Sequence, residues 1–414
     1  MRRQAEKVYS IIEVAQQDGT WGYSDINFSE RRPAGSPGSG TGPEWRQVSP
    51  LPLAGSGLAA AGSEDDRRRV HYQEQDRGVV GTAYEPSSPD GRWTGYRVLT
   101  RETGAPAAHA GGAVAVTGRI GELRVYYLDG GQGEEGLRPV RLAERGAEWT
   151  YAACDEAPRG SPISPLAAVT TERGEYAYYM DTPGRLVEVS WLGEEGWSVH
   201  DVTSGVEGCP APSALSRLAA VGHGTDSRLV FFLDEDNRPV QLEHTVVAGT
   251  KKRPEGGEEW RVRRLSAYGA PVAAAGGQQA VVLCADGHPR LYYLDVDRMV
   301  VEVGFNGRGW EVNHAGAEAD RGTGAPAAAA ASSLAAVPEA DGRAVQVFYL
   351  GAVDPGDGAG AGDHHLIELR GSGARWSSRD LGAELDLPDV ATGVPSPLAA
   401  IRTTGPRVYY TSEE

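Results

Sequence analysis

The chain has 414 residues, and with 40% hydrophobic and 23% charged residues it has the composition of a globular protein with a buried core. Its formal charge of −17 argues against a nucleic-acid partner, because affinity for phosphate backbones comes mainly from Lys and Arg. The 56 glycines and 26 prolines indicate many turns, which favours an all-β fold.

The apolar runs and the cysteines predict no membrane segment, disulfide or metal site. The first residues include two arginines but no apolar stretch of signal-peptide length, and nowhere do eighteen apolar residues stand together. We therefore expect a soluble protein that is cytoplasmic or released by an unconventional route. The cysteines, Cys154, Cys209 and Cys284, form no C-x-x-C pair. The acidic run 234–237 lacks the glycine and glutamate of a calcium loop, so we expect no metal and no cofactor.

A pair of strands recurs seven times along the chain. The first strand is small and apolar, with copies at 57–60, 113–116, 165–168, 217–220, 280–283, 333–336 and 397–400. The second is aromatic, with copies that begin at Arg69, Arg124, Ala177, Val230, Arg290, Val347 and Arg407. Aromatic and β-branched residues followed by turn formers predict strands. The aspartates after four of the copies are expected to be turn residues: Asp129, Asp181, Asp234 and Asp295.

Two more strands complete each unit. The third carries an apolar and acidic pattern in its clearest copies, which begin at Arg185, Pro239, Met299 and His365. A tryptophan opens the fourth, at Trp93, Trp149, Trp197, Trp260, Trp310 and Trp376. The last unit stops after its second strand, and residues 10–14 and Trp21 match the two strands that it lacks.

Four short strands per unit predict one all-β domain over residues 1–414, a single β-propeller of four-stranded antiparallel blades. We count seven blades, with six as the alternative. The closing blade is expected to be shared between the N- and C-termini, which removes an exposed sheet edge. Residues 30–50 and 351–362, rich in Gly, Pro or Ser, are expected to be flexible insertions without secondary structure.

An acid and a tryptophan recur at one spacing. Eight residues separate Glu13 from Trp21, Glu302 from Trp310, and Glu368 from Trp376. In one unit a second-strand arginine precedes the acid by twelve residues, Arg290 before Glu302, and Tyr176 precedes Glu188 by the same offset. This spacing places both side chains on adjacent strands of one blade.

These motifs resemble the fungal fucose-specific lectins, whose blades read S-P-L-A-A, R-V-Y-Y, I-x-E and G-x-W, and the resemblance covers essentially the whole chain. In that family, which usually has six blades, the sugar lies between neighbouring blades. The Arg of R-V-Y-Y and the Glu of I-x-E come from one blade and the Trp from the next. The resemblance implies a lectin without catalysis, with fucosylated glycans as partners and a possible homodimer.

The resemblance implies sites of unequal completeness. A guanidinium donates to sugar oxygens, a carboxylate accepts from hydroxyls, and an indole covers the apolar face of the sugar. Two sites are expected to be complete: Arg290, Glu302 and Trp376, and Arg407, Glu13 and Trp93. Two lack the arginine and are weaker candidates: Tyr176, Glu188 and Trp260, and Gln346, Glu368 and Trp21.

The other three units lack the acid and are expected to be silent. Their residues are Arg69, Gly81 and Trp149; Arg124, Arg141 and Trp197; and Leu229, Gln241 and Trp310. These substitutions leave open a specificity that has drifted to another sugar. The tryptophans also suit plain blade packing, and Arg290 with Glu302 suits a cross-strand salt bridge worth under about 1 kcal/mol.

Two other functions suit a propeller. A sialidase-like glycosidase would carry repeated S-x-D-x-G-x-x-W boxes, but the nearest segment, 88–93, has the wrong spacing and occurs once. Glycoside hydrolysis also needs two carboxylates, whereas the repeat supplies one acid per blade. An interaction scaffold of the WD type would show recurring G-H and W-D dipeptides, which are absent. His364 and His365 are expected to be solvated.

Overall fold

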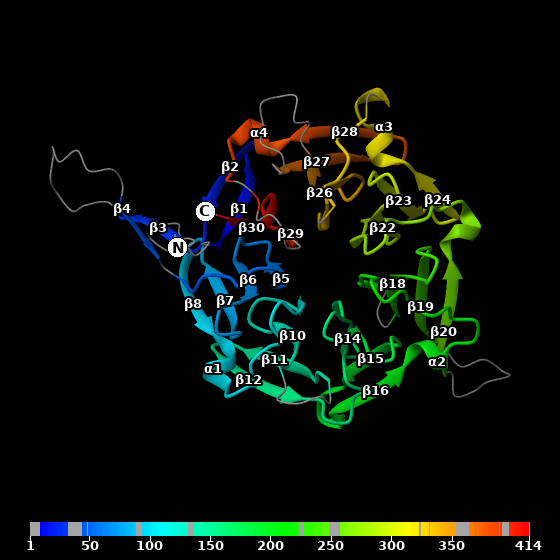
Figure 1. Cartoon of the computed structure of the whole chain (residues 1–414), viewed down its shortest axis with the longest axis horizontal. Coiled ribbons are helices and arrows are strands. Elements are labelled where there is room, and N and C mark those ends of the chain that lie inside the picture. Colours follow the sequence, from blue (N-terminus) through cyan, green and yellow to red (C-terminus); the bar gives the residue numbers. More distant parts are fainter. Residues whose placement is uncertain are drawn as a thin grey trace, which may run out of the picture.

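The chain closes into a ring of seven four-stranded antiparallel sheets, which confirms the predicted seven-bladed β-propeller (Figure 1). The computed structural model describes residues 9–31, 44–47, 49–87, 93–130, 136–223, 227–247, 257–322, 324–330, 332–352, 364–388, 390 and 397–413. None of the helices in this part of the chain is both long and apolar enough to cross a membrane.

We number the blades 1 to 7 in the chain order of their innermost strands. Blades 1 to 3 contain β5 (Leu58–Gly62), β6 (Arg68–Gln73), β7 (Val79–Tyr84) and β8 (Trp93–Val98); β9 (Val114–Thr117), β10 (Arg124–Leu128), β11 (Pro139–Arg145) and β12 (Glu148–Ala153); and β13 (Leu166–Thr170), β14 (Glu175–Met180), β15 (Leu186–Trp191) and β16 (Trp197–Asp201). Blades 4 to 6 contain β17 (Ala219–His223), β18 (Ser227–Leu233), β19 (Pro239–Val247) and β20 (Gly257–Arg264); β21 (Gln279–Leu283), β22 (Pro289–Leu294), β23 (Val300–Phe305) and β24 (Trp310–Asn313); and β25 (Leu334–Pro338), β26 (Val345–Ala352), β27 (His364–Ser372) and β28 (Arg375–Asp380). Blade 7 contains β29 (Leu398–Arg402), β30 (Pro406–Glu413), β1 (Tyr9–Gln17) and β2 (Thr20–Asp25).

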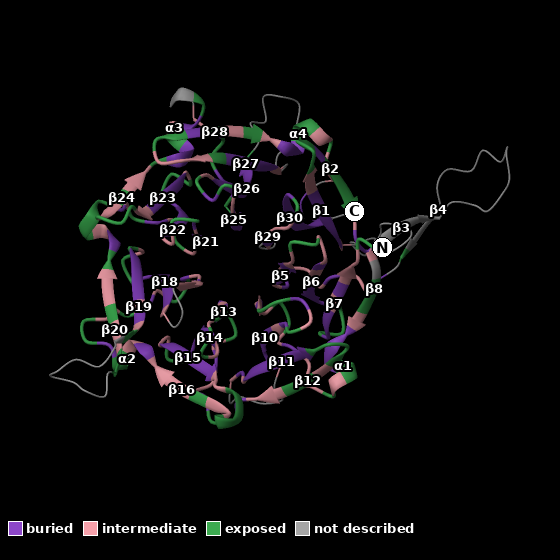
Figure 2. Ribbon diagram, turned by 180° about the vertical axis from the view of Figure 1, so that it is seen from behind, coloured by how far each residue is buried: buried purple, intermediate pink, exposed green. Residues whose placement is uncertain are grey.

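Short helices follow five of the outermost strands. They are α1 (Leu99–Thr103), α2 (Val202–Gly205), η2 (Leu265–Tyr268), α3 (Ala315–Gly322) and α4 (Leu381–Leu385), and η1 (Gly193–Glu195) joins β15 to β16. The middle strands of the blades are largely buried, whereas the outermost strands and these helices are partly exposed at the rim (Figure 2). The core is therefore divided among the faces between neighbouring blades.

Strand β1 closes the ring as the third strand of blade 7. It lies between β2 and β30, with Ile12 opposite Tyr410 in the antiparallel register. The side chains of Ile11 and Ile12 are almost completely buried. The predicted sharing of one blade between the two termini is confirmed.

The prediction that residues 30–50 carry no secondary structure is wrong in part. Strands β3 (Phe28–Arg31) and β4 (Glu44–Gln47) pair antiparallel. The prediction failed because the turn-forming residues that prompted it are concentrated at 33–43, between two segments that contain neither Gly nor Pro. Residues 32–43 and 353–363 lie outside the described residues, and 351–352 end strand β26.

A tyrosine ties each of six blades to the segment that leads into it. The second aromatic residue of the second strand donates its hydroxyl to a proline carbonyl 21 to 23 residues earlier. The pairs are Tyr72 to Pro50, Tyr127 to Pro106, Tyr179 to Pro158, Tyr293 to Pro271, Tyr349 to Pro326 and Tyr410 to Pro388. Blade 4 has Phe232 at this position. The repeated bond fixes the path of the chain between blades.

The aspartates after the aromatic strands are turn residues, as predicted. Each accepts a backbone N–H from the residue immediately before the third strand. The donors to Asp129, Asp181, Asp234 and Asp295 are Arg138, Arg185, Arg238 and Met299. This bond sets the turn between the second and third strands.

A disulfide across the closing strands tests the shared blade. The hydroxyl oxygens of Ser10 and Ser412 lie 2.8 Å apart on paired residues. We expect Ser10→Cys combined with Ser412→Cys to form an intramolecular disulfide on oxidation, seen as a faster band on a non-reducing gel and a higher melting temperature. The two single variants are the controls. A folded double variant that stays reduced under oxidation would contradict this closure.

The tyrosine-to-proline bonds predict a stability effect without loss of fold. Tyr293→Phe removes the hydroxyl that donates to Pro271, at 2.8 Å. We expect a loss of about 1 kcal/mol in the free energy of unfolding, measured by denaturant titration. Tyr268→Phe, at an exposed tyrosine, should change it by only a few tenths of that. Equal effects in both variants would show that the bond contributes nothing.

Candidate functional site

The predicted site residues meet at the seven interfaces between blades. In every blade, the position at which the acid is expected pairs with the first aromatic residue of the second strand or its replacement. The pairs, from blade 7 onward, are Glu13 with Tyr409, Gly81 with His71, Arg141 with Tyr126, Glu188 with Tyr178, Gln241 with Phe231, Glu302 with Tyr292 and Glu368 with Phe348. We call the first member of each pair the acid position.

The tryptophan of the following blade packs against this pair. Its ring lies edge-on to the aromatic residue of the preceding blade, with centroids 6.0 to 6.1 Å apart. These contacts are Trp21 with Phe348, Trp149 with His71, Trp93 with Tyr409 and Trp376 with Tyr292. The structure thus brings an acid position and the tryptophan of the next blade to one interface, which we name by its two blades.

Interface 5/6 brings together Arg290, Glu302 and Trp376. The Arg290 guanidinium lies 3.6 Å from the Glu302 carboxylate, farther than a hydrogen bond, and its side chain is 16% exposed. Glu302 accepts from the Tyr292 hydroxyl at 2.7 Å and from the Asn313 amide at 2.8 Å. Trp376 is 5% exposed. The Arg290 guanidinium, which also hydrogen-bonds Cys284, therefore lies beside a carboxylate, and the indole of the next blade packs against the tyrosine bonded to that carboxylate.

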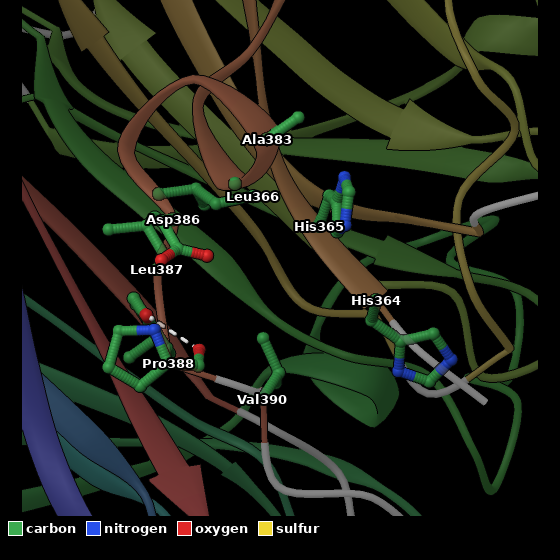
Figure 3. Close-up of a pocket in the computed structure, with 10 residues that line it drawn as sticks. His364, His365, Leu366, Ala383, Asp386, Leu387, Pro388 and Val390 are labelled. Atoms are coloured by element: carbon green, nitrogen blue, oxygen red, sulfur yellow. Dashed lines mark hydrogen bonds between the residues drawn. The ribbon is translucent and has the colours of Figure 1, made fainter. Parts of the chain in front are cut away.

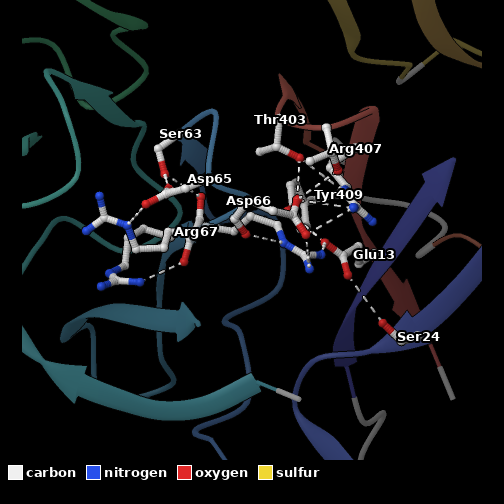
Figure 4. A network of polar contacts seen from close by, with 12 residues as sticks. Glu13, Ser24, Ser63, Asp65, Asp66, Arg67, Thr403, Arg407 and Tyr409 are labelled. Carbon is white, nitrogen blue, oxygen red and sulfur yellow. Dashed lines mark hydrogen bonds and ion pairs between the residues drawn. The ribbon is translucent and has the colours of Figure 1, made fainter. Parts of the chain in front are cut away.

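Interface 7/1 gives Arg407 a different ion-pair partner from the acid that the sequence grouped with it. Trp93 lies near Glu13 through Tyr409, whose hydroxyl donates to Glu13 at 2.9 Å. Arg407, however, forms its ion pair with Asp66 of blade 1, at 3.2 Å (Figure 4). The Arg407 side chain is buried, with 2% of its surface exposed. Its guanidinium is thus engaged by an acid of the following blade.

Arg68, which sequence reasoning missed, binds Glu13 instead. Its Nη1 donates to the Glu13 carboxylate at 2.5 Å, and the two side chains are 2% and 6% exposed. The guanidinium carbon lies 3.4 Å from the ring centroid of Tyr84 and 5.9 Å from that of Trp93. A cation from blade 1 therefore occupies both the acid of blade 7 and the aromatic faces beside it.

Interface 3/4 repeats this arrangement. Arg228 of blade 4 donates from Nε and Nη2 to Glu188 of blade 3, both at 2.8 Å. Its guanidinium carbon lies 3.8 Å from the Tyr176 ring centroid and 5.3 Å from that of Trp260. Its Nη1 also lies 2.7 Å from His244 Nδ1. Burial, together with the Arg228 charge, lowers the pKa of His244, which favours the neutral ring.

Interface 2/3 carries the same ion pair with its charges exchanged. Arg141 stands at the acid position of blade 2, and Glu175 of blade 3 accepts from it at 2.6 Å and from Arg124 at 2.6 Å. Burial alone would raise the pKa of Glu175, but the two guanidiniums hold it below its usual value. Arg141 also stacks 4.8 Å from the ring centroid of Trp191, which lies edge-on to Trp197.

Interface 6/7 holds the other weaker candidate. Gln346 donates to Glu368 at 2.6 Å, and Trp21 lies edge-on to Phe348. Burial raises the pKa of Glu368 above its ordinary value. This interface has an acid and an indole, with an amide where interface 5/6 has a guanidinium.

Interface 1/2 places a histidine in front of a glycine. His71 is 1% exposed, and neither ring nitrogen has a hydrogen-bond partner among the described residues. Burial, with a smaller contribution from Arg69, lowers the pKa of His71 to about 3. A side chain at Gly81 would come within 3.0 Å of the His71 ring. Gly81 leaves the acid position without a carboxylate, and Arg69 pairs with Glu85 at 2.6 Å instead.

Interface 4/5 is mainly apolar. Leu229 and Trp310 belong to one hydrophobic cluster, and Gln241 lies 3.4 Å from Arg263. It has no charged group at the acid position.

A small pocket of about 250 Å³ lies apart from the acid positions, between the start of β27, α4 and the segment before β29 (Figure 3). Its lining includes His364, His365 and Asp386. The prediction that His365 is solvated is wrong in part, because its Nδ1 lies 2.8 Å from Asp380. Within the described ranges, no three His, Cys, Asp or Glu side chains are grouped closely enough to hold a metal ion.

Comparison with known proteins supports the fold. No family model matches the chain, and no curated protein matches it by sequence. A triple mutant of AofleA from Arthrobotrys oligospora is similar with a TM-score of 0.50 and 16% identity over 80% of this chain and 87% of its own. A fucose-recognising lectin from Aleuria aurantia, a six-bladed β-propeller, has a TM-score of 0.47 and 15% identity over 78% and 94%. An ulvan lyase, a polysaccharide lyase, has a TM-score of 0.49 and 12% identity over 88% and 93%. At 16% identity the likeness to AofleA shows the fold alone, in agreement with the strand order: the chain is a β-propeller.

Proposed function

We propose that this protein is a lectin that binds L-fucose or fucosylated glycans at interface 5/6 without catalysis. The sequence motifs that resemble the fungal fucose-specific lectins support this proposal. The site would use Arg290 as donor to sugar oxygens, Glu302 as acceptor from hydroxyls and Trp376 as the apolar face. Fucose suits such a site because its sixth carbon is a methyl group.

The observation that carries the proposal is that Arg290 is partly exposed and makes no hydrogen bond to Glu302. At 3.6 Å from Glu302 it is held beside the acid by charge, without a hydrogen bond between them. Its side chain is 16% exposed, which lets a ligand reach it, and it also hydrogen-bonds Cys284. Arg68 and Arg228, in contrast, donate to their acids at 2.5 and 2.8 Å and are 2% and 4% exposed.

The geometry favours binding over glycoside hydrolysis. Hydrolysis needs two carboxylates on either side of one glycosidic bond. The contacts that the structure records for Glu302 are with Arg290, Tyr292 and Asn313, none of which is an acid. An interaction scaffold is the other alternative, and retention on fucose-agarose with release by free sugar separates it from a lectin.

A calorimetric titration with L-fucose, with galactose as comparison, tests the proposal. We expect a dissociation constant of roughly 10 to 100 μM for the unaltered protein. Arg290→Ala should weaken binding about thirtyfold, or about 2 kcal/mol, because it removes the donor to the sugar oxygens and the cation beside Glu302.

Arg69→Ala is the matched control, because Arg69 occupies the same strand position in blade 1 but pairs with Glu85. It should bind fucose as the unaltered protein does. A folded Arg290→Ala variant with unchanged affinity would move the site elsewhere. No heat with fucose from the unaltered protein would refute fucose as the ligand.

A further inference from the structure

Two strand positions meet across the blades at three interfaces, and the equivalent positions can be identified at the other four. One is the acid position of a blade. The other lies on the second strand of the following blade, three residues before the aromatic residue that pairs with that blade's own acid position. We call this second position the facing position. Across interfaces 7/1 to 6/7 the pairs are Glu13 with Arg68, Gly81 with Leu123, Arg141 with Glu175, Glu188 with Arg228, Gln241 with Pro289, Glu302 with Val345, and Glu368 with Pro406.

The charges of these pairs are matched at three interfaces. Both positions are charged at interfaces 7/1, 2/3 and 3/4, and there they form ion pairs of opposite sign at 2.5 to 2.8 Å. At interface 2/3 the arginine stands at the acid position and the glutamate at the facing position. The ion pair therefore forms with the two charges exchanged. At interfaces 5/6 and 6/7 the residue at the facing position is apolar instead. The residue at the facing position thus separates acids that form an ion pair with the next blade from acids that do not.

At interfaces 7/1 and 3/4 the guanidinium takes up both recognition elements. Its N–H groups use the carboxylate oxygens, and its flat face covers aromatic rings at 3.4 and 3.8 Å. These are the two features that a neutral sugar would need, an acceptor and an apolar surface. Displacing the guanidinium would leave two buried charges unpaired, which is strongly unfavourable.

We propose that the guanidinium groups of Arg68 and Arg228 are built-in occupants of interfaces 7/1 and 3/4 and close them to a sugar. The facing position thereby determines which interfaces are open, and Val345 leaves interface 5/6 open. This inference rests on the proposed function for the identity of the ligand. It reduces the two complete sites predicted from the sequence to one.

Val345→Arg tests closure at the open interface. Val345 is fully buried in one cluster with Tyr292 and Trp376, so an arginine there would reach Glu302 as Arg228 reaches Glu188. We expect the affinity for L-fucose, measured by calorimetry, to fall at least about tenfold. Val345→Ile, which keeps the position apolar, is the control and should retain affinity. A folded Val345→Arg variant that binds fucose as the unaltered protein does would overturn the inference.

A second variant tests occupancy without a sugar. Arg228→Ala should lower the melting temperature by several degrees, because it leaves Glu188 buried and unpaired. Millimolar guanidinium chloride should restore part of this loss relative to the same concentration of sodium chloride, and should not raise the melting temperature of the unaltered protein. Absence of this rescue would contradict the occupancy. If the unaltered protein binds no fucose, the proposed function is refuted. The rescue by guanidinium chloride still decides whether Arg228 occupies interface 3/4.

Discussion

The backbone pairing of β1 with β30 is the constraint on which the other features depend. A propeller blade buries its faces only against its neighbours, so an open ring would expose two of them. The pairing runs from Tyr9 opposite Glu413 to Ala15 opposite Arg407, and it joins the two ends of the chain within one sheet. It also creates interfaces 6/7 and 7/1, because β1 supplies Glu13 and β2 supplies Trp21. The number of candidate sites therefore follows from closure.

In the proposed function, the same interface positions serve stability or recognition, according to the residue at the facing position. A buried carboxylate is costly unless it is paired, and an arginine from the next blade pairs Glu13 and Glu188. Where the next blade has Val345, the partners of the acid among the described residues lie within its own blade, as Tyr292 and Asn313 do. In the proposed function, a sugar hydroxyl completes the environment of that acid. A binding site and a structural ion pair then differ by one residue.

Much of the fold could be predicted from the sequence because each blade repeats one pattern. The aromatic strands, the tryptophans and the match of residues 10–14 to a third strand gave seven blades and their closure. The pairing of β3 with β4 was missed, since the strong turn formers between these strands dominate the composition.

The site was less predictable. Spacing within a blade placed Glu302 near Arg290, but it says nothing of which side chain arrives from the neighbouring blade. Arg68, Glu175 and Arg228 stand immediately before the residues that were compared with the lectin motif, so their presence was visible in the sequence. Their role was not, because it depends on the packing of two blades. Arg407 shows the same limit, as it matches the motif and pairs with Asp66.

A crystal structure with bound α-methyl fucoside would test most directly which interfaces are open. The proposals predict sugar density at interface 5/6, in contact with Arg290 and Glu302, and unchanged ion pairs without sugar at interfaces 7/1 and 3/4. Sugar beside Glu13 or Glu188, with Arg68 or Arg228 displaced, would contradict them.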